Sequence, residues 1–486
     1  MVSLRTRSAK ALAEVSSSLP GGGEHRSGQI EMTEAIGDAI DSKKHLIVTA
    51  GTGTGKSLAY AIPAALSGKR TIIATATKAL QDQLANKDLP FLQDAVATPF
   101  EFAVLKGRSN YVCQQQLDEL AESGNQMGLE GLEDEDDVND EQLVKIRTWA
   151  KKTDTGDRAE LDFEPNARTW AAVSVGPSEC PGKRKCAAGE RCFAEWARER
   201  ALEADITVVN THLYALDLVT DGAILGEHDV VIIDEAHQLE DIASAAAGFD
   251  LTLGRFRNLA RTIGSIVADD TLVERVSELG GRLADDLEPH VGKRLRSHDF
   301  DGDLARTLSR ARDRANEAIE TLRKIPKDSA LEVIGRKERA TQAATHLALD
   351  IDVALDMVEG TVAWVEGRRS PALRVASIDV AELLADRLWG NRTAILTSAT
   401  IPANLADRLG LDNTEHVALD VGSPFDYEAA GLLYCAAHMP DPRSDDYRSA
   451  IHRETEALIM AAEGKTLVLF TSWTVSYTHL TLPTKA

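Results

Sequence analysis

The sequence predicts an α/β fold in which helices wrap a parallel sheet. Three observations support this: short apolar segments alternate with helical stretches, a glycine-rich loop follows one apolar segment, and an acidic box follows another. The segments expected to form strands of this sheet are 46–49, 71–75, 102–105, 206–209 and 230–233, with further strand-like patterns at 373–376, 394–397 and 466–470.

The glycine-rich loop reads A-G-T-G-T-G-K-S and lies between the first predicted strand and a predicted helix. Its glycines let backbone N–H groups turn inward toward phosphate oxygens, and the helix adds the positive end of its dipole. A lysine supplies a mobile charge for the β and γ phosphates, and a serine hydroxyl can ligate magnesium. The predicted nucleotide-binding residues are Gly51, Thr52, Gly53, Thr54, Gly55, Lys56 and Ser57.

The acidic box D-E-A-H begins at Asp234, directly after the predicted strand 230–233. Its position places the Asp234 carboxylate at the strand end that faces the same crevice as the loop. Asp234 can hold magnesium, and Glu235 can orient or deprotonate the attacking water. Together, the loop and the box predict ATP hydrolysis.

Four cysteines lie between these two motifs with the spacing C-x66-C-x5-C-x5-C. In a reducing compartment such a cluster favours metal binding over disulfides. The wide gaps favour an iron-sulfur cluster over the short knuckles of structural zinc sites, although zinc and unligated thiols stay open from the ligands alone. The predicted ligands are Cys113, Cys180, Cys186 and Cys192, whereas Cys435 is expected to be a small core residue.

Composition sets further limits. The 486 residues, 43% of them apolar, can build about three domains. No run of about 18 apolar residues and no signal peptide is found, so we expect a cytoplasmic protein without a membrane partner. The net charge of −23 argues against bulk attraction to nucleic acid but not against a local basic channel. Part of that charge lies in the acidic run 130–141, which we expect to be a solvated, flexible loop.

Two segments interrupt the alternating pattern. The first, 107–204, carries the cysteines and the acidic run. The second, 249–367, is dominated by helical periodicity and is expected to form a helical domain. On one of its predicted helices, Arg306, Arg310 and Arg314 share a face, which is either a phosphate contact or an ordinary hydrated stripe.

The chain resembles the DinG/XPD family of iron-sulfur DNA helicases in helicase superfamily 2, and within it the bacterial DinG-like branch. The resemblance covers about residues 24–475. It rests on R-S-G-Q at 26–29, the phosphate loop, T-A-T-K-A-L-Q-D-Q-L at 75–84, K-G-R-S-N-Y-V-C at 106–113, V-V-N-T-H-L at 208–213, D-E-A-H at 234–237 and T-S-A-T at 397–400.

The resemblance implies roles that the residues alone leave ambiguous. Arg26 and Gln29 would recognise adenine, and Thr77 and Gln83 would lie near DNA. His237, Ser398 and Thr400 would couple hydrolysis to movement. The four cysteines would hold a 4Fe-4S cluster. The cluster module and the helical arch would form a gate for single-stranded DNA, and the protein would move 5′ to 3′ along this strand.

The implied architecture is a RecA-like motor lobe with two insertions and the start of a second RecA-like lobe. The second lobe matches the family only in S-P-F-D at 423–426 and V-L-F-T-S-W at 468–473, so we expect a fragment with reduced activity. Only about two dozen residues precede Arg26, so no nuclease domain is expected. The expected boundaries are 1–106, 205–248 and 368–403 for lobe 1, 107–204 for the cluster domain, 249–367 for the arch, 404–475 for the incomplete lobe 2 and 476–486 for an atypical tail.

The sequence thus predicts an ATP-dependent DNA helicase that uses ATP, Mg²⁺ and a 4Fe-4S cluster, in DNA repair or replication. Its expected partners are single-stranded and forked DNA, and it is expected to be a monomer. The alternatives are a non-catalytic, nucleotide-switched DNA-binding or redox-sensing module and a zinc-containing ATPase that acts on proteins.

Overall fold

The structure is a computed structural model of the chain. It describes residues 2–19, 23–123, 139–177, 179–267, 269–300, 302–326, 328–357, 360–411 and 416–469. The chain divides into two units, Met1–Pro424 and Phe425–Ala486. Most of the acidic run, 130–138, and the expected tail, 476–486, lie outside the described residues, as does Phe470 of the last predicted strand.

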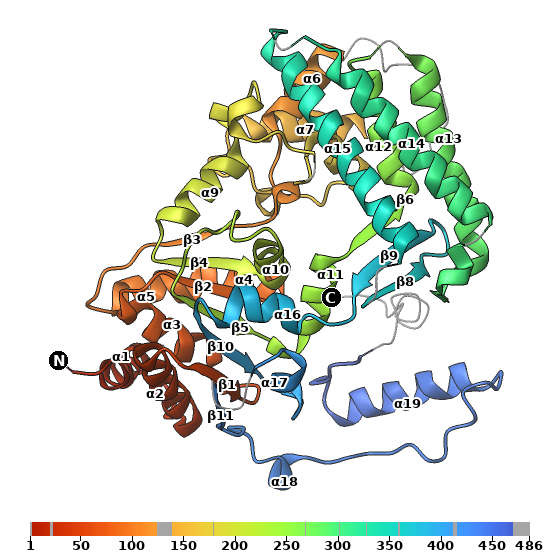
Figure 1. The fold of residues 1–486 in the computed structure, drawn as a ribbon. Helices are drawn as coiled ribbons and strands as arrows, with labels where there is room; N and C mark the ends of the chain where they lie inside the picture. The colour runs from red at the N-terminus through yellow and green to blue at the C-terminus, as the bar shows by residue number, and fades with distance from the viewer. Residues whose placement is uncertain are drawn as a thin grey trace. The chain divides into compact units, whose positions relative to one another are not determined.

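The first unit contains a seven-stranded parallel sheet (Figure 1). The strand order is β11-β1-β10-β5-β2-β4-β3, so strands distant in sequence become neighbours. This arrangement confirms the predicted α/β fold. The strands are β1 (His45–Thr49), β2 (Thr71–Thr75), β3 (Phe102–Val104), β4 (Ile206–Asn210), β5 (Val230–Asp234), β10 (Thr393–Ser398) and β11 (His416–Asp420).

Both faces of this sheet are covered, which explains why its inner strands read as continuous apolar runs. In β1, Leu46 and Val48 pack into one core cluster, and Ile47 packs into the other. The first cluster includes side chains from α1 (Leu4–Ser18), α2 (Ser27–Ser42), α3 (Lys56–Ser67) and α5 (Leu89–Ala95). The second includes α9 (Phe193–Glu203), α10 (Thr211–Val219), α11 (Leu239–Ala247), α16 (Ala381–Leu384) and α17 (Leu405–Arg408).

The segment that carries the cysteines lies between β3 and β4. Its core is continuous with the second cluster, because Ile146, Trp170 and Phe193 are buried in it. Asp140 and Glu141, which end the acidic run, form the first turn of a helix there. Its described helices are α6 (Gln114–Ser123), α7 (Asp140–Ala150), α8 (Ala167–Val173) and α9, and short 3₁₀ turns lie between α7 and α9.

The second inserted segment has a separate core and contains more than helices. Its long helices are α12 (Leu253–Gly264), α13 (Asp270–Leu287), α14 (Asp303–Arg323) and α15 (Leu331–Asp356). They pack on a four-stranded antiparallel sheet in the order β6-β9-β8-β7 (Figure 1). These strands are β6 (Phe249–Thr252), β7 (Arg294–Leu295), β8 (Thr361–Glu366) and β9 (Ala372–Ser377).

Strand β9 therefore differs from the sequence expectation, which assigned 373–376 to the motor lobe. It pairs with β6 and β8, so a boundary after Gly367 cuts through this sheet. The strand pattern is visible in the sequence, but the choice of partner depends on tertiary packing. Strand β11 also differs, because it pairs with β1 although it follows the expected start of lobe 2.

The second unit contains α18 (Tyr427–Ala430) and α19 (Tyr447–Ala461). Residues 466–469 do not form the predicted strand, because Leu467 and Leu469 are exposed and have no sheet neighbour among the described residues. The expectation for Cys435 is also wrong, since this residue is exposed. Across the described ranges, no helix is both long and apolar enough to cross a membrane.

A buried histidine makes the fold of the first unit sensitive to acid. His228 Nε2 is 3.3 Å from the Tyr214 hydroxyl, and its Nδ1 is 3.0 Å from the Gly226 carbonyl oxygen. Burial, with the positive charges of Arg392 and Arg70 nearby, lowers the pKa of His228 to about 3. The ring therefore stays neutral in the folded protein at pH values where the unfolded chain is already protonated.

We expect His228 to lower the free energy of unfolding as the pH falls from 6.5 toward 3, because its ring is protonated in the unfolded chain but not in the folded protein. Between pH 7.5 and pH 5 the loss should be about 2 kcal/mol. Denaturant unfolding at both pH values should show a smaller pH dependence in His228→Gln than in the wild type. His346→Gln, which alters an exposed histidine, should keep the wild-type dependence. An unchanged dependence in His228→Gln would refute the assignment.

Candidate nucleotide and metal sites

The glycine-rich loop joins the carboxyl end of β1 to the first residue of α3, Lys56. Gly53 and Gly55 adopt positive φ angles of 81° and 86°, which residues with a side chain rarely adopt. A Cβ at Gly55 would also lie 2.3 Å from Gln29 Nε2. Thr54 Oγ1 donates to the Gly51 carbonyl at 2.7 Å and closes the loop. The predicted cradle is thus built at the start of a 12-residue helix.

Arg26 and Gln29 lie against this loop. Arg26 Nη1 donates to the Gly53 carbonyl at 2.5 Å, and Gln29 Nε2 donates to the Gly55 carbonyl at 2.9 Å. Lys56 Nζ donates to the Ala50 carbonyl at 3.2 Å, which keeps the ammonium group at the loop. The structure therefore brings the two residues expected to recognise adenine close to Lys56, which is expected to bind phosphate.

Asp234 is the last residue of β5, and only 2% of its surface is exposed. Its Oδ2 accepts a hydrogen bond from the Tyr60 hydroxyl at 3.3 Å, and its Oδ1 accepts one from the Glu235 N–H at 2.9 Å. Burial raises the pKa of Asp234 to about 6, while the nearby Lys56 ammonium lowers it. The Tyr60 hydroxyl also interacts with Ser57, so both predicted magnesium ligands contact the same hydroxyl group.

A second polar network connects β5 with β10. His237 Nδ1 lies 2.8 Å from Ser398 Oγ, and Ser398 Oγ donates to Glu235 Oε2 at 2.9 Å. Since a serine hydroxyl has one hydrogen, the histidine ring must donate its Nδ1 proton to Ser398 in this chain of bonds. The Thr400 N–H also donates to Ser398 Oγ, at 3.3 Å. Ser398 thus links the acidic box to the T-S-A-T segment.

The four predicted metal-binding cysteines line one small cavity. Cys113 comes from the segment before α6, whereas Cys180, Cys186 and Cys192 come from turns before α9. The turns are tight, since a Cβ at Gly189 would lie 2.1 Å from the Lys183 carbonyl oxygen. The fold therefore brings the four cysteines, which are separated in the sequence, together at one cavity.

Positive charge accompanies these thiols. Arg108 Nη1 lies 3.5 Å from Cys180 Sγ and also pairs with Glu195. Arg339 of α15, only 6% exposed, lines the same cavity. Burial raises the pKa of the Cys113 thiol to about 12. In the described part of the chain, no three His, Cys, Asp or Glu residues are arranged to hold a single metal ion.

Comparisons with known proteins agree with this geometry. A model of the DEAD/DEAH box helicase family matches residues 30–129. The chain is 35% identical to the ATP-dependent helicase DinG of Mycobacterium tuberculosis over 484 residues, which cover 93% of this chain and 72% of that protein. The chain belongs to the DinG family. This membership confirms the recognised resemblance and the predicted enzyme class, an ATP-dependent helicase.

Other relatives of this DinG-family chain support the same assignment. It is 31% identical to the ATP-dependent DNA helicase YoaA of Escherichia coli, with 92% of this chain and 71% of that protein covered. Among solved structures, an XPD helicase matches with a TM-score of 0.52 and 14% identity, over 95% of this chain and 75% of that one. At this identity the structural match supports the fold alone.

The two residues that the DinG resemblance places near DNA are both exposed. Thr77 caps α4 (Lys78–Gln83), because its hydroxyl accepts from the Leu80 N–H at 3.2 Å. Gln83 Nε2 donates to Asp88 Oδ2 at 2.9 Å. On α14, Arg306 pairs with Asp303 and Arg314 pairs with Glu317, while Arg310 is exposed.

Sequence reasoning missed three residues of these sites in the DinG-family chain. Tyr60 follows Lys56 by one helical turn, a spacing that could have placed it on the face toward β5. Arg108 lies five residues before Cys113, inside a motif already noted. Arg339 comes from another domain, and nothing in the sequence indicates its approach to the thiols.

In this DinG-family chain, removal of the Ser398 hydroxyl should separate hydrolysis from movement. Ser398→Ala breaks the bonds to His237 and Glu235 but leaves Lys56 and Asp234 in place. We expect DNA-stimulated ATP turnover to fall less than about tenfold, because one neutral hydrogen bond is worth about 1 kcal/mol. Strand separation should fall much further than turnover. Parallel assays of both activities check this, and an equal loss of the two would contradict it.

Proposed function

We propose that this chain is an ATP-dependent DNA helicase that moves 5′ to 3′ along single-stranded DNA and acts on forked substrates in DNA repair or replication. The observation that carries the proposal is the convergence of three strand ends. The loop after β1, Asp234 at the end of β5 and Ser398 at the end of β10 lie at the carboxyl edge of one sheet. This edge is where ligands bind in α/β folds.

The residues have distinct roles in ATP hydrolysis. Lys56 would neutralise the β and γ phosphates, and the N–H groups from Gly51 to Ser57 would hold their oxygens. Arg26 and Gln29 would hold the adenine. Ser57 and Asp234 would hold Mg²⁺, which lowers the negative charge of the phosphates when bound. Asp234 must be ionised for this. Burial raises its pKa to about 6, and the Lys56 ammonium group favours the ionised carboxylate.

Glu235 would orient or deprotonate the attacking water. Its carboxylate already accepts a hydrogen bond from Ser398 Oγ. A change in the charge around Glu235 would therefore alter its hydrogen bond with Ser398 directly. It would alter the contacts of His237 and Thr400 through Ser398. These contacts support the role of this network in coupling hydrolysis to movement.

The four thiols suit a 4Fe-4S cluster. The cavity collects cysteines from two separate segments of the chain. Four thiolates make a cluster anionic overall, and Arg108 and Arg339 supply compensating charge at the cavity. Such a cluster would brace the segment between β3 and β4, which has few long elements of its own.

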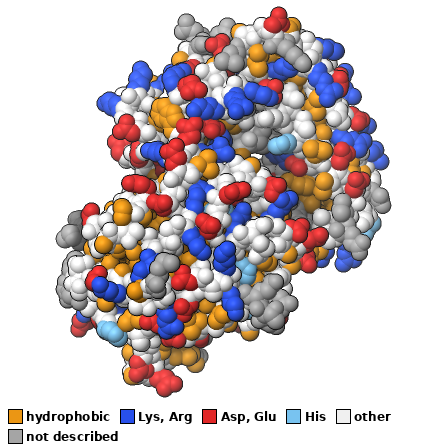
Figure 2. Space-filling view, turned by 60° about the vertical axis from the view of Figure 1, so that its left-hand side comes forward, with side chains coloured by type: hydrophobic (Ala, Val, Ile, Leu, Met, Phe, Trp, Pro, Cys, Tyr) orange, Lys and Arg blue, Asp and Glu red, His pale blue; other side chains and the backbone are white. Residues whose placement is uncertain are grey.

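The remaining parts of the proposal concern DNA and domains. The cysteine-bearing segment and the α12–α15 segment would form the gate for DNA, with Thr77 and Gln83 on its path. On the face drawn in Figure 2, acidic and basic side chains are interspersed rather than gathered into one basic surface. Binding by a local channel fits this pattern and the net charge of −23 better than bulk attraction. The proposal includes a monomer that acts in the cytoplasm.

DNA-stimulated ATP hydrolysis is the direct test. We expect single-stranded DNA to raise turnover strongly in the presence of Mg²⁺. Nucleotide binding without turnover would instead support a nucleotide-switched binding module and would overturn the proposal.

A further inference from the structure

The strand β3 forms one edge of the seven-stranded sheet, and a cavity of about 640 Å³ lies along it. In the parallel pairing with β4, the Leu105 N–H donates to the Val208 carbonyl, and the Glu101 carbonyl accepts from the Ile206 N–H. Since successive residues of a strand alternate their hydrogen-bonding direction, Phe102 and Val104 direct their N–H and C=O groups away from β4. No partner is recorded for these four groups in the described part of the chain.

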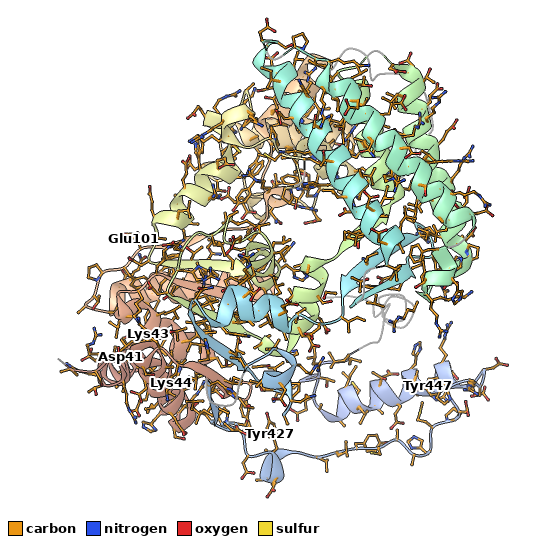
Figure 3. The ribbon with its side chains drawn as sticks, viewed as in Figure 1. Asp41, Lys43, Lys44, Glu101, Tyr427 and Tyr447 are labelled. Carbon is orange, nitrogen blue, oxygen red and sulfur yellow. The ribbon has the colours of Figure 1, made fainter. Side chains whose placement is uncertain are left out.

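The cavity has walls and a closed end. One wall comes from α9, through Ala197 and Arg200, and the other comes from Ala85 and Asn86 after α4. Figure 3 places Glu101 at the start of β3, near the end of α9. The open edge therefore runs along the floor of a groove rather than on a flat surface.

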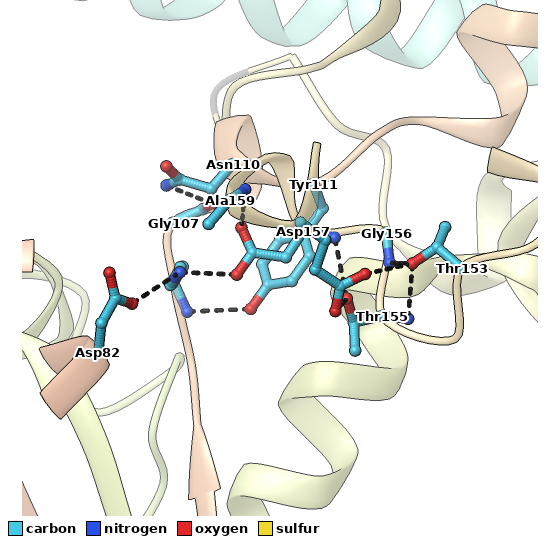
Figure 4. Close-up of polar contacts among 11 residues, drawn as sticks. Asp82, Gly107, Asn110, Tyr111, Thr153, Thr155, Gly156, Asp157 and Ala159 are labelled. Carbon is cyan, nitrogen blue, oxygen red and sulfur yellow. Dashed lines mark hydrogen bonds and ion pairs between the residues drawn. The ribbon is translucent and has the colours of Figure 1, made fainter. Parts of the chain in front are cut away.

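Polar contacts close the far end of this groove (Figure 4). The Lys106 N–H donates to the Tyr111 hydroxyl at 3.0 Å, and Lys106 Nζ lies 2.7 Å from Asp157 Oδ2. Thus the next outward-facing N–H group already has a partner. Among the described residues of β3, only Phe102 and Val104 have outward groups without a recorded partner. An unpaired edge of this kind is usually covered or made repulsive, because it can pair with another chain.

The charge of the groove is acidic. Lys106 and Arg200 are its two cations, and Lys106 is shared between Asp157 and Asp82. Five carboxylates surround them: Asp82, Glu101, Asp157, Glu160 and Glu203. This excess repels the phosphates of nucleic acid and attracts a cationic ligand.

We propose that the groove along β3 binds an extended, positively charged peptide segment of a partner protein. The segment adds as a short strand to β3, with backbone hydrogen bonds to Phe102 and Val104. Its lysine or arginine side chains contact the carboxylates of the groove. Main-chain pairing supplies affinity in this mode of recognition, and the flanking side chains supply specificity.

The experiment uses a fluorescein-labelled probe, acetyl-Lys-Val-Lys-Val-Lys-amide, and the same probe with glutamate in place of lysine. Fluorescence anisotropy should show binding of the lysine probe that weakens with salt, and no binding of the glutamate probe. Hydrogen exchange should slow in the peptide that contains Phe102 and Val104 when the lysine probe is added.

Two variants separate strand pairing from charge. Val104→Pro removes an outward N–H without touching the bonds to β4, and it should weaken binding about fivefold or more. Glu101→Lys/Glu203→Lys should reverse the preference toward the glutamate probe, and this test stands even if the proline variant does not fold. Glu14→Gln, a change at an exposed residue of α1, should bind like the wild type.

Three results would overturn the proposal: no binding of the lysine probe, binding unchanged in both groove variants, or protection of residues 102–104 by single-stranded DNA rather than by the probe. The last result would assign the groove to the DNA path. ATP turnover without peptide does not depend on these residues, so failure here leaves the proposed helicase function intact.

Discussion

Replacement of Lys56 by alanine should abolish DNA-stimulated ATP turnover, with a loss of at least about 100-fold. The ammonium group lies at the loop, bonded to the Ala50 carbonyl, and no other lysine is found at this loop among the described residues. Its removal leaves the negative charge of the phosphates without its main protein counter-charge. Steady-state ATP hydrolysis with saturating single-stranded DNA measures the loss.

The matched control is Lys44→Ala, which alters an exposed lysine just before β1. It should hydrolyse ATP at the wild-type rate and have the same unfolding midpoint. Lys56→Ala should also keep that midpoint, because Lys56 does not belong to either core cluster of the sheet. Unchanged turnover in Lys56→Ala would refute the role assigned to this residue.

Replacement of Cys180 and Cys186 together by serine should remove the cluster. Two of the four thiols at the cavity are lost, and hydroxyl groups are poor ligands for iron. Iron content should fall from about four atoms per chain to below one, with parallel loss of acid-labile sulfide and of visible absorbance. Strand separation should be lost as well, because the segment between β3 and β4 is no longer braced.

Cys435→Ser provides the control for this double variant. Cys435 is exposed and does not line the cavity, so its replacement should leave iron and sulfide unchanged. Wild-type protein prepared without oxygen that contains zinc, or neither iron nor sulfide, would contradict the cluster proposal. Thermal unfolding adds a readout that is independent of helicase activity, since a bound cluster stabilises the folded state.

Much of the motor lobe follows from local sequence. The loop from Gly51 to Ser57 and the acidic box at Asp234 each follow a buried apolar strand, and parallel strands bring such ends to one edge. The convergence of four cysteines could also be predicted, because cysteine is chemically distinctive and three of the four lie close together in the sequence. These predictions succeeded because each depends on residues that are close in sequence or chemically distinctive.

Other features depend on long-range packing and could not be predicted in this way. The partner of β9 is decided by the core of the inserted domain, not by the residues 372–377 themselves. Arg339 of α15 lines the thiol cavity although it lies more than 140 residues after Cys192. No local sequence pattern predicts a contact over such a separation. The open edge of β3 likewise emerges only from the strand order.

Strand separation on tailed duplexes is the most direct test of the proposed 5′ to 3′ DNA helicase activity. A duplex with a 5′ single-stranded tail and one with a 3′ tail are each incubated with the protein, ATP and Mg²⁺, and the released strand is measured. We expect ATP-dependent release from the 5′-tailed duplex and from a fork, with Lys56→Ala inactive on both. ATP hydrolysis without release from any substrate, or release only from the 3′-tailed duplex, would contradict it.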